Sequence, residues 1–218
     1  MPIDLPPLVQ EELSPDGGAH PAGVLVLLHG RGADEHDLEP AADHLGRNLR
    51  RVLLRAPLPW GPGWQWYSTD GALAPARDSW DASLQALSEA VARIRAASPA
   101  APLILGGFSQ GAALAAGWTA ASGDRADGLA LFSGYLAPLV RPASLADLPV
   151  FVGHGRADPV LPIENGRALA DAFHRMGARV TARDYDVGHG LASGEMVDAA
   201  AWIREILEGR AAGEGPAG

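Results

Sequence analysis

The chain of 218 residues is 47% hydrophobic, and it is long enough to bury a core without disulfide or metal staples. It contains no cysteine and no lysine, which excludes disulfides, thiolate metal sites, a cysteine nucleophile, a Walker phosphate loop and a lysine Schiff base. The formal net charge of −9 opposes the phosphate neutralisation that nucleic-acid binding requires, so no nucleic-acid partner is expected.

Basic and apolar residues are distributed in a way that gives no sign of a membrane protein. The only basic cluster, Arg47, Arg50, Arg51 and Arg55, is interpreted as a solvated helix end that leads into a strand. The first twenty residues contain no basic residue and no long apolar stretch, so they do not resemble a secretory signal. The longest strongly apolar run, 24–28, is far shorter than the roughly twenty residues that span a bilayer. A cytoplasmic protein without stable membrane insertion is therefore expected.

Strands are predicted from short apolar runs next to glycine or proline. In chain order, residues 8–13 are expected to form an antiparallel strand before a glycine-rich turn. Five runs that are apolar almost throughout follow, and such runs are typical of strands covered on both faces in a parallel sheet. These runs are 24–28, 52–54, 103–105, 129–132 and 150–152. A last strand, 180–185, alternates apolar and polar residues and is predicted at an edge of the sheet.

Helical periodicity lies between these strands. One helix starts near Trp80, with Asp78 or Ser79 expected as its cap, and its apolar positions recur every three or four residues up to Ile94. The small residues of 112–121 follow the third apolar run, a stripe at 169–176 is stopped by Gly177, and another covers 196–206. This alternation predicts one α/β domain over residues 1–209 and a disordered tail over 210–218.

The most informative motif is Gly107-Phe108-Ser109-Gln110-Gly111, which lies between a predicted strand and a predicted helix. In a G-x-S-x-G turn the serine occupies a strained position, and the flanking glycines let two backbone segments approach closely. The helix that follows offers free N–H groups and a positive dipole to a developing oxyanion. Ser109 is therefore predicted to be a nucleophile, although a glycine-rich turn with an incidental serine has the same pattern.

A serine nucleophile needs a base, and the base needs an orienting carboxylate. Among the histidines after Ser109, His189 follows the last strand and precedes the last helix, where a triad histidine belongs. His174 lies in a helix stripe, and His154 precedes the best acid. His189 is the predicted base, and its alternative is a plain loop residue.

Asp158 is the predicted acid because it directly follows the strand at 150–152, and Pro159 and Pro162 stiffen its loop. Asp184 and Asp186 are rivals because they lie near His189 in the sequence. Residues of one local loop seldom aim at the imidazole Nδ1, which favours Asp158.

Two backbone N–H groups are expected to form the oxyanion hole, those of Gln110 and of Arg31 in the glycine-rich loop after the 24–28 strand. A metal site made by His29, Asp34 and His36 is disfavoured, because the three lack a defined ligand spacing. No metal and no cofactor is therefore predicted.

Four motifs in this order resemble the phospholipase/carboxylesterase family of small α/β-hydrolases, which includes the acyl-protein thioesterases. The resemblance covers roughly residues 20 to 207, and its motifs are Leu28-His29-Gly30-Arg31-Gly32, Gly107-Phe108-Ser109-Gln110-Gly111, His154-Gly155-Arg156-Ala157-Asp158-Pro159-Val160 and Gly188-His189-Gly190. It implies an α/β-hydrolase fold and hydrolysis of esters or thioesters with modest acyl chains. Residues 58–67 differ from the eukaryotic thioesterases, so the chain resembles the bacterial carboxylesterase branch.

The substrate side is predicted from apolar residues. Trp60, Trp64 and Trp66 crowd into a loop that either caps the core or walls an acyl pocket, with Leu73 and Leu161 as further candidates for the pocket. The length leaves no room for a separate lid domain, so small esters are expected to be preferred over long lipids.

The predicted function is a serine carboxylesterase acting on short- to medium-chain carboxylic esters. A thioesterase or lysophospholipase with the same triad is the enzymatic alternative, and an inactive hydrolase fold kept as a binding module is the alternative of another class. An apolar helix face could support a homodimer, although the sequence does not require one.

Overall fold

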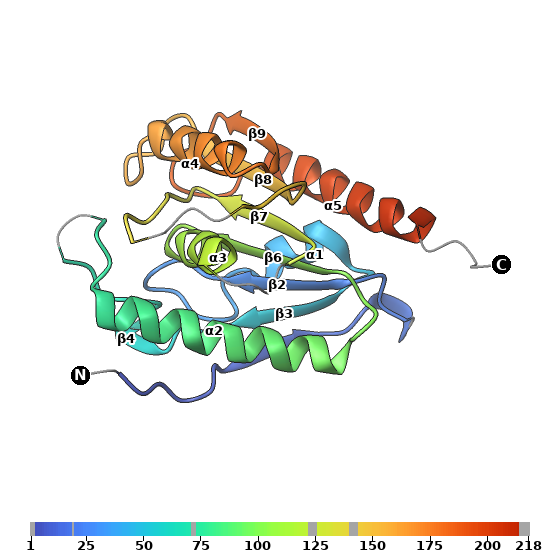
Figure 1. Ribbon diagram of the computed structural model, residues 1–218, viewed down its shortest axis with the longest axis horizontal. Coiled ribbons are helices and arrows are strands. Elements are labelled where there is room, and N and C mark those ends of the chain that lie inside the picture. Colours follow the sequence, from blue (N-terminus) through green and yellow to red (C-terminus); the bar gives the residue numbers. More distant parts are fainter. Residues whose placement is uncertain (1–2, 19, 71–72, 122–125, 140–143, 214–218) are drawn as a thin grey trace.

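The structure is a computed structural model, and it describes residues 3–18, 20–70, 73–121, 126–139 and 144–213 (Figure 1). Seven strands form one sheet in the order β1-β3-β2-β6-β7-β8-β9. They are β1 (Gln10–Leu13), β2 (Val24–Leu28), β3 (Arg50–Leu54), β6 (Leu103–Phe108), β7 (Gly128–Phe132), β8 (Pro149–Gly155) and β9 (Arg179–Tyr185). All neighbouring strands are parallel except β1, which pairs antiparallel with β3, so the predicted antiparallel strand and the predicted edge strand β9 are both confirmed.

Helices cover both faces of this sheet (Figure 1). They are α1 (Glu39–Gly46), α2 (Arg77–Ala97), α3 (Gln110–Ala121), α4 (Ile163–Arg175) and α5 (Ser193–Gly213). The buried side chains of α2, α3 and α4 belong to one apolar cluster, whereas those of α1 and α5 belong to the cluster on the opposite face. This is the predicted α/β-hydrolase architecture, a mostly parallel sheet between two layers of helices.

The two clusters explain why the central strands are apolar throughout. In β2, Val24, Val26 and Leu28 face one cluster, while Leu25 and Leu27 face the other. All five side chains are at most 1% exposed, because successive strand residues point to opposite faces and both faces are covered. The core therefore forms on both sides of the strands whose carboxyl ends carry the loops described below.

Several local features differ from the prediction. Residues 58–65 are a small hairpin of β4 (Leu58–Trp60) and β5 (Gly63–Gln65) rather than a loop. The N-cap of α2 is Ala76, and Asp78 and Ser79 lie inside its first turn. Arg51 is not solvated: its side chain is buried and donates to Asp43 Oδ1 at 2.7 Å.

Helix α5 continues to Gly213, so the first four residues of the predicted disordered tail are helical, and 214–218 lie outside the described residues. Among the described residues, no helix is both long enough and apolar enough to cross a bilayer.

Candidate active site

Ser109 lies on the sharp turn between β6 and α3, at the carboxyl end of a central strand. Its φ of 54° places it in the left-handed region, which costs a residue with a Cβ about 1–2 kcal/mol. The Ser109 N–H donates to the Phe132 carbonyl at 2.9 Å, and the Ser109 carbonyl accepts from the Ala113 N–H at 3.1 Å. The turn therefore holds the serine between the neighbouring strand β7 and the first turn of the helix.

The two glycines of the motif allow this turn to pack. A Cβ on Gly107 would lie 2.6 Å from the Gly111 carbonyl carbon. A Cβ on Gly111 would overlap the carbonyl oxygen of Leu28, at the end of β2. Neither position accepts a side chain without moving backbone, which is the physical reason for glycine at both.

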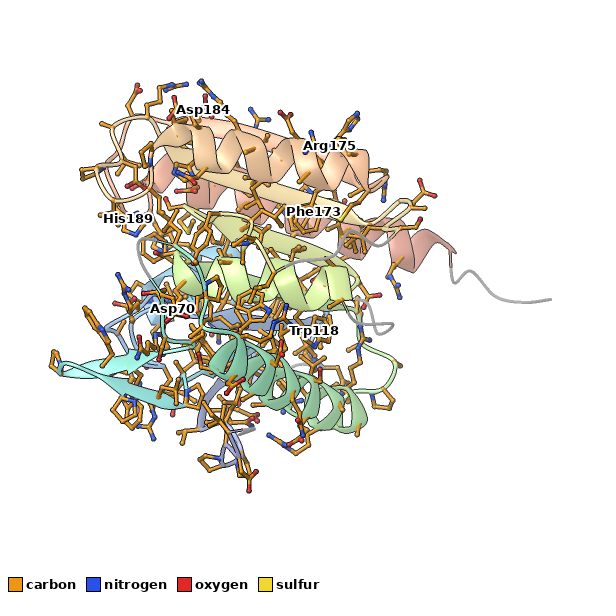
Figure 2. All side chains as sticks on the ribbon, turned by 60° about the vertical axis from the view of Figure 1, so that its left-hand side comes forward. Asp70, Trp118, Phe173, Arg175, Asp184 and His189 are labelled. Atoms are coloured by element: carbon orange, nitrogen blue, oxygen red, sulfur yellow. The ribbon has the colours of Figure 1, made fainter. Side chains whose placement is uncertain are left out.

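Three side chains from distant parts of the sequence meet at this turn. His189 Nε2 lies 2.9 Å from Ser109 Oγ, and His189 Nδ1 lies 2.7 Å from Asp158 Oδ2. The three residues come from the loops after β6, β8 and β9, so the parallel order of the sheet brings them to one end of the molecule. Figure 2 shows His189 at the end of the molecule that also carries the β4–β5 hairpin, opposite to the C-terminal part of α5.

Asp158 is held in one orientation by its own loop. Its Oδ1 accepts from the N–H groups of Val160 and Leu161, each at 2.8 Å, which leaves Oδ2 for His189. Burial would raise the pKa of this carboxyl, but the hydrogen bonds from His189 and the two amides outweigh it, so the pKa is lowered. The group therefore stays ionised at neutral pH.

The rival acids and histidines are engaged elsewhere. Asp184 pairs with Arg167 at 2.7 Å and Asp186 with Arg156 at 2.6 Å, both on the surface. His154 is buried, and its Nε2 donates to the Leu161 carbonyl at 2.8 Å while lying 3.5 Å from Asp158 Oδ2. His154 therefore supports the loop of the acid rather than the serine.

His29 anchors the loop after β2. Its Nε2 accepts from the Ala56 N–H at 3.0 Å, so its Nδ1 is the protonated nitrogen and donates to the Gly30 carbonyl at 2.6 Å. Burial lowers the pKa of this imidazole, which keeps it neutral. Its hydrogen bonds fix the loop, and it offers no lone pair to a metal. Among the residues that the structure describes, no group of three or more His, Asp or Glu side chains converges on a metal position.

The two predicted oxyanion donors lie beside the serine. Gln110 is the first residue of α3, so its N–H has no acceptor within the helix. The Gln110 side chain makes two hydrogen bonds to the backbone after β5: it accepts from the Trp66 N–H and donates to the Tyr67 carbonyl, each at 2.8 Å. Arg31 lines the same cleft as Ser109 and Gln110.

This cleft has a volume of about 40 Å³, small beside the roughly 300–1,000 Å³ of most ligand pockets. Leu73 and Leu161 line it, together with three residues that the sequence pattern did not single out: Thr69, Tyr135 and Val160. Tyr135 follows β7 by three residues, and its place at the carboxyl end of a parallel strand was the available signal.

The three candidate tryptophans lie outside the residues that line the cleft. Trp66 is fully buried and donates from Nε1 to the His29 carbonyl at 2.8 Å, so it caps the core instead of walling a pocket. Trp64 packs against the same core cluster and lies under the Arg55 guanidinium. Trp60 is 45% exposed at the tip of the hairpin. Of the two interpretations of this segment, capping of the core fits Trp66.

Glu195 is a buried acid near the base that the sequence pattern did not reveal. It lies in the first turn of α5, is 0% exposed, and accepts from the Ala192 N–H at 3.1 Å through Oε2. Burial raises its pKa to about 7, although the Ala192 hydrogen bond acts in the opposite direction. A glutamate in the first turn that reaches back to the preceding N–H is half of a capping box, and this was the signal available.

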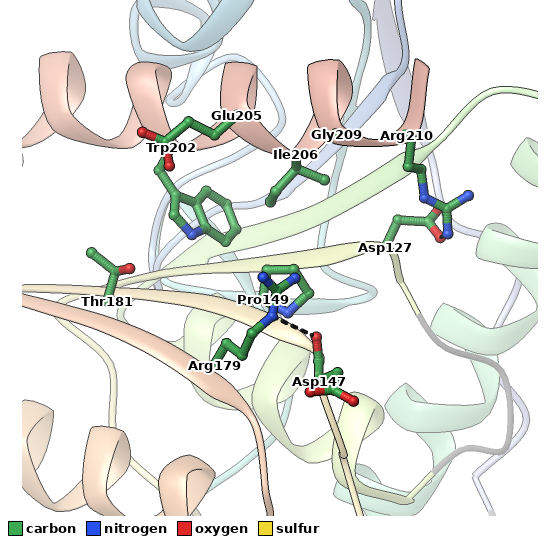
Figure 3. Close-up of a pocket in the computed structure, with 10 residues that line it drawn as sticks. All are labelled: Asp127, Asp147, Pro149, Arg179, Thr181, Trp202, Glu205, Ile206, Gly209 and Arg210. Carbon is green, nitrogen blue, oxygen red and sulfur yellow. Dashed lines mark hydrogen bonds and ion pairs between the residues drawn. The ribbon is translucent and has the colours of Figure 1, made fainter. Parts of the chain in front are cut away.

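A larger cavity of about 500 Å³ lies at the amino ends of β7 to β9, beside the C-terminal half of α5 (Figure 3). Arg210 pairs with Asp127 in this cavity, and Arg179 Nε donates to the Asp147 backbone carbonyl at 3.2 Å. In open α/β sheets, ligands bind at the carboxyl ends of the strands, which is where Ser109 lies. The candidate active site is therefore the smaller cleft.

Comparison with known proteins connects this geometry to a family. Residues 14–207 match the phospholipase/carboxylesterase family. The chain is 30% identical over 214 residues to acyl-protein thioesterase 1 of Neurospora crassa, with 84% of each protein covered. It is 31% identical over 118 residues to acyl-protein thioesterase 1 of Debaryomyces hansenii, and that match spans 50% of each protein, about half the length of this relative.

Solved structures show the same fold. The Bacillus cereus carboxylesterase superposes with a TM-score of 0.82 at 21% identity, covering 91% of this chain and 94% of the other. Acyl-protein thioesterase 2 of Zea mays superposes with a TM-score of 0.74 at 22% identity, covering 91% and 99%. At these identities the likeness concerns the fold.

Proposed function

The chain belongs to the phospholipase/carboxylesterase family and is a hydrolase, and from that premise we propose that it is a serine carboxylesterase acting through Ser109, Asp158 and His189. The single observation that carries the proposal is the pair of hydrogen-bond distances at His189, 2.9 Å to Ser109 Oγ and 2.7 Å to Asp158 Oδ2. These are the contacts through which an imidazole takes a proton from a hydroxyl while a carboxylate holds its other nitrogen.

The reaction follows from the tautomer that Asp158 imposes. Because Asp158 Oδ2 accepts from Nδ1–H, the Nε2 lone pair of His189 faces the Ser109 hydroxyl. Ser109 Oγ attacks the ester carbonyl and its proton passes to Nε2; the same proton then goes to the departing alcohol oxygen as the carbon–oxygen bond breaks. Water repeats these steps on the acyl-enzyme, which releases the acid and restores Ser109.

The oxyanion of each tetrahedral intermediate is assigned to the N–H groups of Gln110 and Arg31. Gln110 contributes a free amide at a helix N-terminus, where the dipole favours negative charge. The nucleophile, the base, its orienting acid and the oxyanion donors all come from the chain. The proposed reaction therefore needs no metal and no cofactor.

A fluorophosphonate probe tests the nucleophile directly, because it reacts readily only with an activated serine. The probe is expected to label the wild-type protein once, and Ser109→Ala is expected to lose both the label and ester hydrolysis. Ser133→Ala is a matched control: Ser133 also follows a parallel strand and has a positive φ of 45°, and the variant is expected to keep the label. Labelling of Ser109→Ala, or retention of most of its activity, would reject the assignment.

Short- to medium-chain esters are the proposed substrates, because the cleft beside Ser109 is small. The measurement is kcat/KM on 4-nitrophenyl esters from acetate to palmitate. A maximum at or below the octanoate is expected, and a maximum at palmitate would contradict the proposal.

Thioester hydrolysis is the second candidate, since the relatives in Neurospora crassa and Debaryomyces hansenii are named acyl-protein thioesterases. Both substrates pass through one acyl-enzyme, so only paired rates on an oxygen ester and a thioester of the same acyl chain separate the two functions. An inactive binding module is disfavoured by the hydrogen bonds between the three side chains, and loss of all labelling would favour it.

We propose the cytoplasm as the location.

A further inference from the structure

Two arginines stack on the two tryptophans of the β4–β5 hairpin. The Arg31 guanidinium carbon lies 5.0 Å from the ring centre of Trp60, and that of Arg55 lies 4.7 Å from the ring centre of Trp64. Stacking on an aromatic face leaves the in-plane N–H groups of a guanidinium open to an acceptor. Each pair therefore presents a positioned set of donors.

The hairpin is fixed to the loop that carries Arg31. Gly32 N–H donates to the Trp64 carbonyl at 2.7 Å, and Trp64 N–H donates to the Ala33 carbonyl at 3.0 Å. A Cβ on Gly32 would lie 3.0 Å from the Trp60 ring, so the indole packs directly on the loop backbone. Trp60 and Arg31 thus belong to one connected unit, of which Arg31 lines the cleft.

The two arginines differ in their acidic partners. Arg55 forms an ion pair with Glu35 at 3.4 Å. For Arg31, no carboxylate of the described residues lies within ion-pairing distance, although Asp34 and Glu35 follow it closely in the chain. Asp34 Oδ1 instead accepts from the His36 N–H at 3.0 Å. Arg31 therefore brings to the lining of the cleft that contains Ser109 a positive charge with no ion-pair partner among the described residues.

Tyr135, another polar residue of the cleft lining, is held by the buried Tyr67 behind it. Tyr67 and Tyr135 share a hydrogen bond between their hydroxyls at 2.8 Å, and Tyr67 is fully buried. Tyr135 and Thr69 line the cleft, and a hydroxyl of either type can donate a hydrogen bond to a ligand. Burial raises the pKa of both tyrosines, so both remain protonated donors.

We propose that this cleft takes an ester whose acyl chain ends in a carboxylate, and that the Arg31 guanidinium binds that carboxylate. The proposal rests on the hydrolytic function proposed above. A carboxylate matches the planar fork of a guanidinium, and such charge-assisted hydrogen bonds are the stronger kind.

The order of the strands places the charge on the acyl side. Arg31 follows β2, and Thr69 and Leu73 lie after the β4–β5 hairpin in the connection that leaves β3, whereas the loop of His189 follows β9. Ser109 follows β6, which lies between these two groups of strands. Because His189 must protonate the leaving alcohol, the alcohol departs on the β9 side and the acyl chain extends toward β2 and β3.

Two methyl esters with the same number of acyl carbons test the proposal: monomethyl glutarate ends its acyl chain in a carboxylate, and methyl valerate ends it in a methyl group. Methanol release gives kcat/KM for each. The wild-type enzyme is expected to prefer monomethyl glutarate by about tenfold or more, the scale of one good charged hydrogen bond. Arg31→Met is expected to bring the ratio near one. The readout is the ratio of the two kcat/KM values, because a general effect of Arg31→Met on catalysis changes both values equally and leaves their ratio unchanged.

Arg55→Met is the matched control, since it also removes one positive charge from a tryptophan of the same hairpin but lies outside the cleft lining. It is expected to keep the wild-type ratio. A wild-type ratio at or below one, or a ratio that Arg31→Met leaves unchanged, overturns the carboxylate proposal while leaving the hydrolase intact. Failure of the proposed function is recognised separately, because Ser109 would then take no label at all.

Discussion

Glu195 should make the stability of the fold depend on pH, and Glu195→Gln should remove that dependence. The carboxyl is 0% exposed, and its Oε1 has no hydrogen-bond partner among the described residues. A glutamine has nearly the same shape, keeps an oxygen for the Ala192 N–H and cannot ionise. The substitution therefore changes the charge of the site with little change in packing.

The magnitude follows from the pKa, which burial raises from an ordinary 4.5 to about 7. Below pH 4.5 both the folded and the unfolded chain carry the proton, so this group adds no pH dependence. Between 4.5 and 7 only the folded chain keeps it, and unfolding becomes easier as the pH rises. Each pKa unit corresponds to about 1.36 kcal/mol, so the ionised form costs about 3 kcal/mol of folding free energy above pH 7.

Urea unfolding, followed by tryptophan fluorescence between pH 4.5 and 8, measures this cost. The difference in unfolding free energy between Glu195→Gln and wild type should grow by about 3 kcal/mol in favour of the variant over this range. All other ionisable groups are shared and cancel in the difference. Glu164→Gln is the control, because Glu164 is an exposed acid in the first turn of α4. A difference for Glu195→Gln that stays constant with pH would refute the reasoning.

Three further predictions concern the serine turn and the acid. Gly111→Ala should lower the free energy of unfolding by about 3 kcal/mol in urea, because its Cβ overlaps the Leu28 carbonyl, whereas Gly194→Ala, with open space around it, should not destabilise the fold. Asp158→Asn should lower kcat about 10⁴-fold, because the wrong imidazole tautomer then faces the serine; a loss below tenfold would argue against the triad. The free energy of unfolding of Ser109→Gly should be about 1 kcal/mol higher than that of Ser109→Ala, because only glycine adopts the positive φ without strain. Equal free energies would show that the turn is unstrained.

Much of the fold was predictable because a strand covered on both faces must be apolar at nearly every position. The runs at 24–28 and 103–105 illustrate this, since neighbouring side chains enter opposite core clusters. The β4–β5 hairpin was not predictable from periodicity. Its strands have three residues each, and it is held by backbone bonds to the loop 32–33 that no local pattern encodes. The same holds for Arg51, whose burial depends on Asp43 from the preceding helix.

In the candidate site, the three proposed catalytic residues could be predicted from the sequence, whereas the wall of the cleft could not. Ser109, Asp158 and His189 follow strands, and the carboxyl ends of parallel strands meet at one edge, so chain order alone indicated that the three lie near each other. The cleft wall depends on which side chains remain uncovered after packing. From the sequence, Trp66 is as good a candidate for the cleft wall as the other tryptophans, but in the structure it is held in the core by hydrogen bonds to His29 and Gln110. Tyr135 lines the cleft instead.

Several unfavourable local features lie around the site, although Asp147, with a φ of 63°, lies at the other end of the sheet. Ser109 and Ser133 have positive φ values at the ends of β6 and β7, and Glu195 carries a desolvated carboxyl six residues after His189. Each costs stability, and each holds a backbone segment next to a group in the proposed reaction. The glycines at 107 and 111 permit the close packing that maintains the strained serine. Removing the strain should therefore stabilise the protein while it weakens catalysis, because the same contacts determine where the hydroxyl and the imidazole lie.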